Sequence, residues 1–242
     1  MSGSKRKRGR MRQKKRGIHF LTVLGTAAIA GTVLIGGLCM ICGHLFHREP
    51  AEVFGALAAT KKVEKPEITE ELLTPNPYSR PELPLEEVHG VVVHYTANPG
   101  TDAGDNRSYF EGLKNSHKTY ASSHFIIGLD GTIIQCIPLD EQAYASNKRN
   151  VDTISIECCH EDNSGKFNEE TYDSLVRLTA WLCGKYNLKQ DGIIRHYDVT
   201  GKDCPRYFVK HEKKWAAFKE EVFEYIDQHA IGDEKENTGE KV

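Results

Sequence analysis

Residues 91–94 read Val-Val-Val-His, and residues 194–208 read IRHYDVTGKDCPRYF. The first stretch predicts a buried strand that ends in the imidazole of His94. The second stretch places His196 and Cys204 eight residues apart. Zinc binds imidazole and thiolate, and a hydrolytic zinc site uses three protein ligands and keeps the fourth position for water. The two stretches together therefore predict a catalytic zinc centre.

The segments around these residues alternate between short apolar runs and amphipathic patterns. Predicted strands cover residues 91–94, 124–128, 132–137, 153–158 and 192–196, and predicted helices cover residues 106–117, 168–187 and 210–229. Most of the apolar runs are continuous, which indicates strands that are covered on both faces. This order predicts an α/β domain with a mixed, mostly parallel central sheet flanked by helices. His94 and His196 would each end a strand, at the edge where such sheets hold their sites.

The N-terminus predicts a membrane anchor. Residues 1–17 form a basic arm with nine Lys or Arg and no acid, and residues 18–46 contain no Asp, Glu, Lys or Arg. The second stretch is long enough to cross the roughly 30 Å hydrocarbon layer of a bilayer as one transmembrane helix. Positive charge stays on the cytoplasmic side, so we expect a single-pass cell-membrane protein with a cytoplasmic N-terminus. The residues after the anchor are then expected on the outer side.

A cleaved signal peptide is the alternative to this anchor, because Ala27, Ala28 and Ala30 resemble a cleavage site. The apolar run continues to Leu45, well beyond the roughly 7 to 15 residues of a signal-peptide core, which favours the uncleaved anchor. The basic arm is also typical of nucleic-acid tails. The rest of the chain, however, has 23 Lys and Arg against 34 Asp and Glu, a net charge of −11. This acidic body argues against a nucleic-acid partner.

Residues 47–84 predict a linker that holds a domain away from the membrane. They combine Glu and Lys with repeated prolines and show no sustained periodicity. Residues 85–230 have the length of one ordinary domain. Residues 231–242 are polar and are predicted to form a tail. The sequence shows no internal repeat and does not determine an oligomeric state.

Four motifs in this order and spacing resemble the zinc-dependent N-acetylmuramoyl-L-alanine amidases, a family of type 2 amidases that includes the peptidoglycan recognition proteins. They are VVVHYTA (residues 91–97), SSHFIIG followed by DGTIIQ (122–135), SIE (155–157) and RHYDVTGKDCP (195–205). The resemblance covers most of residues 88–216. It implies a peptidoglycan amidase that uses Zn²⁺ to hydrolyse the amide bond between N-acetylmuramoyl and the L-alanine of the stem peptide.

The resemblance implies that His94, His196 and Cys204 are the zinc ligands. Some members carry Asp as the third ligand, and Asp203 precedes the cysteine in this chain. The eight-residue step and the following Pro205 match the members that use cysteine. A thiolate also contributes the negative charge that two neutral imidazoles lack.

The family's catalytic groups match two further residues. Glu157 corresponds to the glutamate that takes a proton from water and returns it to the departing amine. Lys202 corresponds to the cation that stabilises the oxyanion of the tetrahedral intermediate. The residues expected to contact the substrate are Tyr95, Thr96, His124 and Tyr144. A structural role is the alternative for His124, because it begins a predicted strand.

Two positions depart from the family pattern. Some phage members carry tyrosine where this chain has Ser123, and those members lack the glutamate, so Glu157 is expected to take that role. Many members carry Trp-His where this chain has Tyr144 and Ala145. The loss of that imidazole removes a group expected to contact the substrate, while the zinc ligands are retained.

Two other functions remain compatible with these motifs. Some relatives bind peptidoglycan without cleaving it, but they typically lack the cysteine ligand that this chain keeps. A zinc amidase could also act on soluble muropeptides, although an outward-facing anchor favours intact cell wall. An outer location permits disulfides. Reduced buried thiols are equally compatible with the remaining cysteines of the predicted domain, which are Cys136, Cys158, Cys159 and Cys183.

Overall fold

The structure is a computed structural model that describes residues 59–231. The predicted basic arm at residues 1–17, the predicted anchor at 18–46 and almost all of the predicted tail at 231–242 lie outside the described residues. Over the part of the chain that is described, no helix is long and apolar enough to span a lipid bilayer. The described residues belong to one structural unit, which begins at Ala59.

A central sheet of six strands organises this unit, in the order β1-β4-β3-β5-β2-β6. The strands are β1 (Thr69–Glu70), β2 (Gly90–Tyr95), β3 (Phe125–Ile127), β4 (Ile133–Gln135), β5 (Thr153–Cys158) and β6 (Ile193–Arg195). β3 and β4 are antiparallel, and every other neighbouring pair in the sheet is parallel. The tight turn between β3 and β4 contains Gly131 at φ 80°, a conformation that glycine adopts without strain. The predicted mixed, mostly parallel sheet is confirmed.

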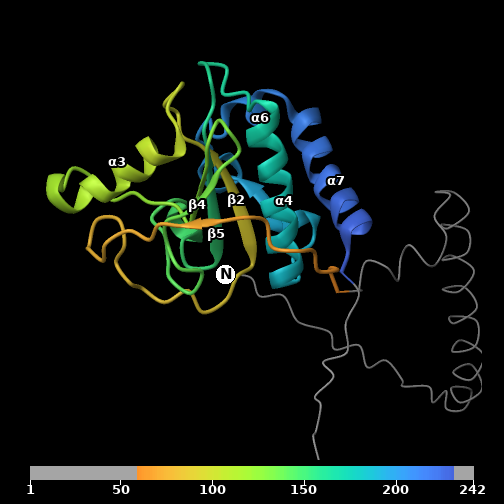
Figure 1. The fold of residues 1–242 in the computed structure, drawn as a ribbon, viewed down its shortest axis with the longest axis horizontal. Coiled ribbons are helices and arrows are strands. Elements are labelled where there is room, and N and C mark those ends of the chain that lie inside the picture. The colour runs from red at the N-terminus through yellow and green to blue at the C-terminus, as the bar shows by residue number, and fades with distance from the viewer. Residues whose placement is uncertain (1–58, 232–242) are drawn as a thin grey trace, which may run out of the picture. The chain divides into compact units, whose positions relative to one another are not determined.

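Helices cover both faces of the sheet, as Figure 1 shows, with α3 on one side and α4 and α7 on the other. The α-helices are α3 (Ala103–Ser116), α4 (Glu169–Tyr186), α5 (His196–Thr200), α6 (Arg206–Lys210) and α7 (Glu212–His229), and the short 3₁₀ helices are η1 (Asn147–Arg149) and η2 (Gln190–Gly192). α3 begins three residues before the predicted start, because Asp102 caps its first turn in a capping box with Asp105. The short helices α5 and α6 were not predicted, and His196, which was predicted to end a strand, begins α5.

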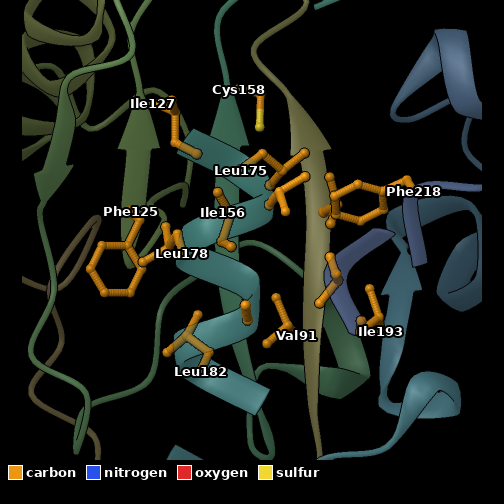
Figure 2. Close-up of a cluster of buried hydrophobic side chains, with 14 of the residues drawn as sticks. Val91, Phe125, Ile127, Ile156, Cys158, Leu175, Leu178, Leu182, Ile193 and Phe218 are labelled. Carbon is orange, nitrogen blue, oxygen red and sulfur yellow. The ribbon is translucent and has the colours of Figure 1, made fainter. Parts of the chain in front are cut away.

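The larger hydrophobic core lies between the sheet and α4 with α7. Figure 2 shows Leu175, Leu178 and Leu182 of α4 directed towards the strands. Their spacing of three and four residues keeps them on one helix face. They pack against strand residues that include Val91 and Ile156, all fully buried. This packing explains why the residues of β2 and β5 that face α4 and α7 are apolar.

The second core lies on the opposite face, where α3 packs mainly on β3 and β4. Phe110 and Leu113 of α3 belong to the same buried cluster as Ile126 and Ile134 of these strands. At the carboxyl ends of β2 and β5, this face of the sheet carries polar side chains in place of a covering helix. That end of the sheet therefore carries the candidate site.

Residues 59–84 fold onto the domain, although the sequence predicted a linker there. β1 pairs in parallel with β4 at the edge of the sheet, and Leu73 is fully buried. The guanidinium of Arg80 donates two 2.8 Å hydrogen bonds to the carboxylate of Glu141. The difference arises because Val63 and Leu73 are buried by residues distant in the sequence, and no local periodicity signals such contacts.

The described chain enters the domain at the edge where the parallel strands begin. The backbone N–H of Thr60 donates to Oδ1 of Asn187, and its hydroxyl donates to the carbonyl of Leu188, at 2.8 and 2.7 Å. Asn187 ends α4, and Leu188 leads into the turn before β6. His94 and His196 lie at the other ends of β2 and β6. Residue 60 and the two imidazoles are therefore at opposite edges of the sheet.

The five cysteines of the described residues are buried and free of disulfides: Cys136, Cys158, Cys159, Cys183 and Cys204. Burial raises the pKa of Cys136, Cys159 and Cys183 to about 12. These thiols remain protonated near neutral pH, and buried protonated thiols are chemically inert. Of the two alternatives that the sequence left open, the structure contains reduced, buried thiols.

Candidate metal centre

Three potential ligands converge at the carboxyl edge of the sheet. His94 lies near the end of β2, and His196 begins α5 directly after β6, which is the parallel neighbour of β2. Cys204 follows α5, and its carbonyl accepts a 2.9 Å hydrogen bond from the backbone N–H of Tyr197. This hydrogen bond holds Cys204 beside the start of α5. The structure thereby brings together the three residues that the sequence predicted as zinc ligands.

The spacing of the three ligand atoms fits a tetrahedral metal ion. Nδ1 of His94 and Nδ1 of His196 are 3.1 Å apart, and Sγ of Cys204 is 3.9 Å from Nδ1 of His94. All three atoms lie within 4.8 Å of one another. Zinc with bonds near 2.0 Å to nitrogen and 2.3 Å to sulfur would hold such atoms roughly 3.3 to 3.6 Å apart. Small side-chain movements would therefore close the triangle around an ion.

The charges at the centre also fit a cation. Burial, reinforced by His196 and Lys202, holds the pKa of His94 well below its usual value, and burial together with Lys202 lowers the pKa of His196 to about 4. Both imidazoles are therefore neutral near pH 7, which is the form that binds metal. Burial and the neighbouring Glu157 raise the pKa of the Cys204 thiol to about 12. A divalent cation between the three atoms would reverse that effect and favour the thiolate.

A loop that the sequence analysis did not identify holds the outer nitrogens of both imidazoles. Nε2 of His94 lies 3.2 Å from Oγ of Ser146, and Nε2 of His196 lies 3.1 Å from Oδ1 of Asn147. Because each Nδ1 faces the other ligands, the proton of each imidazole lies on Nε2, which donates a hydrogen bond to one of these oxygens. Such partners orient metal-binding imidazoles and increase their basicity.

The conformation of this loop is fixed by Asn150. Its side-chain oxygen accepts hydrogen bonds from the backbone N–H groups of Ala145 and Ser146, at 3.1 and 2.6 Å. Asn147 adopts the left-handed conformation with φ 53°, which asparagine tolerates better than most residues. The loop therefore presents Ser146 and Asn147 in a defined geometry.

A buried arginine fixes the strand end that carries His196. Arg195 is only 5% exposed, and its guanidinium pairs with Asp198 at 2.7 Å and with Glu212 at 2.6 Å. These pairs join β6 to α5 and α7. Removal of either carboxylate would leave a buried charge partly unpaired, which is strongly destabilising.

Glu157 lies directly beside the ligands. It is the register partner of His94 in the parallel pair β5 and β2, and its Oε1 is 4.0 Å from Nδ1 of that histidine. Its other oxygen, Oε2, is buried without a hydrogen-bond partner. Burial raises the pKa of Glu157 to about 8, although the charge of Lys202 opposes the shift. A buried oxygen without a partner needs an explanation, and a water molecule between the carboxylate and the ligand atoms would supply it.

The other predicted residues differ in their access to the centre. Lys202 is exposed, and its charge lowers the pKa of both ligand imidazoles. The backbone N–H of Tyr95 donates to the Cys204 sulfur, but the tyrosine ring is buried against His160 at 5.0 Å. Thr96 is half-buried, and its hydroxyl has no hydrogen-bond partner. Lys202 is therefore accessible to a ligand, whereas the Thr96 hydroxyl is buried.

His124 has the structural role that was the alternative to substrate contact. Its Nδ1 accepts from the backbone N–H of Ser155 at 3.0 Å, so Nε2 carries the proton and donates to the carbonyl of Glu141 at 2.9 Å. Both ring nitrogens are used inside the protein, and burial lowers the pKa of His124 to about 4. Tyr144, in contrast, is half-buried and contacts the edge of the exposed Tyr120.

Comparison with known proteins identifies relatives of this arrangement. Residues 84–207 match a family described as N-acetylmuramoyl-L-alanine amidase. A probable N-acetylmuramoyl-L-alanine amidase of Bacillus licheniformis is 34% identical over 168 residues, which are 64% of this chain and 47% of that protein. The amidase BlyA of Bacillus subtilis is also 34% identical over 168 residues, which are 61% of this chain and 44% of the relative. The chain thus spans about half the length of the curated relatives that it matches.

Solved structures share the fold. The catalytic domain of XlyA superposes with a TM-score of 0.54 at 26% identity, covering 65% of this chain and 99% of that domain. The structure of PlyL superposes with a TM-score of 0.56 at 24% identity, covering 65% of this chain and 97% of that one. The central sheet and its flanking helices are therefore shared with these proteins.

Proposed function

Because this chain belongs to the N-acetylmuramoyl-L-alanine amidase family, we propose that it is a zinc-dependent enzyme acting on peptidoglycan. The reaction is hydrolysis of the amide bond between N-acetylmuramoyl and the L-alanine of the stem peptide. One observation carries this proposal: His94, His196 and Cys204 converge, and the unpartnered carboxylate of Glu157 lies beside them. A binding module would have no use for such a carboxylate.

Zinc, when bound by the three ligands, supplies a Lewis acid that polarises the scissile carbonyl and lowers the pKa of water. The protein supplies the proton transfers. Oε2 of Glu157 has no partner of its own, and in the ionised form, which Lys202 favours and a bound cation would favour further, it can take a proton from the attacking water. The same oxygen then returns the proton to the departing amine nitrogen as the C–N bond breaks. A carboxylic acid on the lactyl group and a free L-alanine amine result.

Lys202 is assigned to the carbonyl oxygen of the substrate. It is exposed and lies two residues before the ligand Cys204, and its charge lowers the pKa of both ligand imidazoles. A cation at this position stabilises the negative charge that develops on the oxygen in the transition state. A donor of this kind typically lowers the activation barrier by about 2.7 to 4 kcal/mol.

The proposed location is the outer side of the cell membrane, with residues 18–46 as a single-pass anchor in the lipid bilayer. The sequence supports it through the charge-free apolar stretch and the basic residues before it.

The test is digestion of purified muropeptides by the full-length chain in detergent, with mass analysis of the products. Release of intact stem peptide in the presence of zinc, and its loss in Cys204→Ala, is the expected result. If wild type and Cys204→Ala both bind peptidoglycan and neither releases stem peptide, the protein is a binding module. If soluble muropeptides are cut and intact sacculi are not, the substrate is a soluble fragment. Protease accessibility on whole cells tests the outer location separately.

A further inference from the structure

Four aromatic side chains form a continuous strip beside the candidate metal centre. We call Tyr78, His117, Tyr120 and Tyr144 the aromatic strip. Tyr78 stacks between His117, at 4.4 Å between ring centroids, and Tyr120, at 5.1 Å. Tyr120 in turn meets the edge of Tyr144 at 5.6 Å. The rings come from three segments that are distant in the sequence.

The aromatic strip is accessible to solvent. Tyr120 is 61% exposed, His117 is exposed, and Tyr78 and Tyr144 are half-buried. A tyrosine that only filled a core would be buried. Exposed rings in contact with one another present an apolar surface, and such surfaces commonly mark binding sites.

Backbone hydrogen bonds hold the three segments of the strip together. The backbone N–H of Ala121 donates to the carbonyl of Tyr78 at 3.1 Å. The N–H of Ser122 donates to the carbonyl of Tyr144 at 3.1 Å, and the Ser122 hydroxyl accepts from the N–H of Tyr144 at 2.9 Å. The loop after α3 is thus joined to both neighbouring segments. Because the loop is already ordered, ligand binding would cost little conformational entropy.

The turn that carries Tyr78 is fixed in its own right. The side-chain oxygen of Asn76 accepts hydrogen bonds from the backbone N–H groups of Tyr78 and Ser79, at 2.8 and 3.0 Å. The largely buried ion pair of Arg80 with Glu141 anchors the end of the turn to the domain. The rings are therefore presented on a rigid support.

The aromatic strip begins at the rim of the metal centre. Tyr144 lies two residues before Ser146, whose hydroxyl contacts the ligand His94, and three residues before Asn147, which contacts the ligand His196. A substrate whose amide bond lies at the ligands would therefore have the strip within reach on one side.

We infer that the aromatic strip binds the glycan strand of peptidoglycan, an inference that rests on the proposed function. The scissile amide joins a sugar to a peptide, so glycan must leave the centre on one side. Sugar rings carry apolar C–H faces, which pack on the electron-rich faces of aromatic rings. Three of the four rings are uncharged tyrosines, whereas the carboxylates of a stem peptide would require cations. The strip therefore matches the sugar portion of the substrate.

The test compares Tyr120→Ala with a matched control, Tyr109→Ala, in the full-length chain. Tyr109 is a tyrosine on α3 that is 55% exposed and is outside the aromatic strip. The probe is immobilised glycan strands from which all stem peptides have been removed. Tyr120→Ala is expected to bind them roughly three- to tenfold more weakly, as expected for the loss of one aromatic contact. Tyr109→Ala and Tyr120→Trp are expected to bind like wild type.

Kinetics provide a second measurement. KM for polymeric peptidoglycan is expected to rise by the same factor in Tyr120→Ala and to equal the wild-type value in Tyr109→Ala. Equal glycan binding by Tyr120→Ala and wild type would overturn the inference, as would an equal loss in Tyr109→Ala. If wild type cuts no muropeptide, the proposed function fails, and glycan binding by the same variants still decides the role of the strip.

Discussion

His94 on β2 and Glu157 on β5 are direct register partners in two parallel strands. This pairing directs both side chains from the same face of the sheet and brings a carboxylate oxygen to 4.0 Å from the ligand nitrogen. Neither residue needs a loop to bring it into position. The carboxylate is thus held by two paired strands of the central sheet that are almost entirely buried, and catalytic groups on such rigid elements are precisely positioned.

The first prediction concerns the proton transfers. Glu157→Gln keeps the shape of the side chain but removes its ability to accept a proton, so kcat should fall by about 10² to 10⁴. Metal content, measured by mass spectrometry, should equal that of wild type. The control is Glu161→Gln, which changes an exposed glutamate after the same strand. Wild-type kcat in Glu157→Gln would exclude Glu157 as the base.

Metal removal is expected to affect both activity and stability. A chelator should abolish activity and lower the melting temperature of wild type, because a ligand that binds only the folded state stabilises it. Cys204→Ala should contain no zinc and should show no further decrease with chelator. Asp203→Asn alters the adjacent acid, which pairs with Arg206, and should retain its metal. The opposite result for these two variants would make Asp203 the third ligand.

The loop that contacts both imidazoles should control metal affinity. Asn147→Ala removes the oxygen 3.1 Å from Nε2 of His196, and the loss of such a partner typically weakens metal binding about 10- to 100-fold. Competition with a chromogenic chelator measures the change directly and does not depend on turnover. Asn163→Ala, at an exposed position, provides the control. Unchanged affinity in Asn147→Ala would show that the contact does not orient the ring.

Acid should destabilise the fold through His124. Burial lowers the pKa of this residue from 6.5 to about 4, so between these values the unfolded chain binds a proton that the folded chain does not. The contribution of His124 is therefore fully present above pH 6.5 and is lost as the pH falls towards 4. The loss amounts to about 3 kcal/mol at 1.36 kcal/mol per pKa unit.

The measurement is the urea-induced unfolding free energy at pH 7 and at pH 5, with chelator present so that metal release plays no part. The decrease should be smaller in His124→Gln than in wild type. NMR titration of His124 in wild type gives the pKa independently, in case the variant does not fold. A pKa near 6.5 would contradict the prediction.

Residues 59–84 should be required for stability. Leu73→Ala creates a cavity beneath this segment, and such substitutions cost about 2 to 5 kcal/mol. A fragment that begins at residue 85 also loses β1 and the Arg80–Glu141 ion pair, and should melt at a lower temperature than a fragment that begins at residue 59. Differential scanning calorimetry of both fragments provides the comparison. Equal melting temperatures would show that residues 59–84 do not stabilise the domain, as expected of a linker.

Sequence patterns predicted the central strands well, because the residues of β2 and β5 that face α4 and α7 are buried and apolar. The helix at α4 was predicted because its apolar residues, among them Leu175 and Leu182, repeat with helical spacing. β1 has only two residues and exists because β4 offers an unpaired edge. No pattern within residues 69–70 could reveal that pairing.

The candidate site divides in the same way. His94 and His196 were identifiable because each follows or closes an apolar run, and the parallel strands β2 and β6 bring the ends of these runs together. Ser146 and Asn147 were not identifiable, because the side chain of Asn150 determines the loop conformation that turns them towards the imidazoles. Arg195 was missed because its partner Glu212 lies seventeen residues away on another element. Contacts of this kind depend on tertiary structure and leave no local periodicity.

The attachment of residue 60 has a mechanical consequence. A pull on the chain at Ala59 would first load the bonds of Thr60 to Asn187 and Leu188, and next the exposed ion pair of Lys61 with Asp227. These contacts lie at the ends of α4 and α7 and at the edge of the sheet remote from the ligands. Force applied to the chain at residue 59 would therefore enter the domain at the ends of these two helices, away from the three candidate ligands.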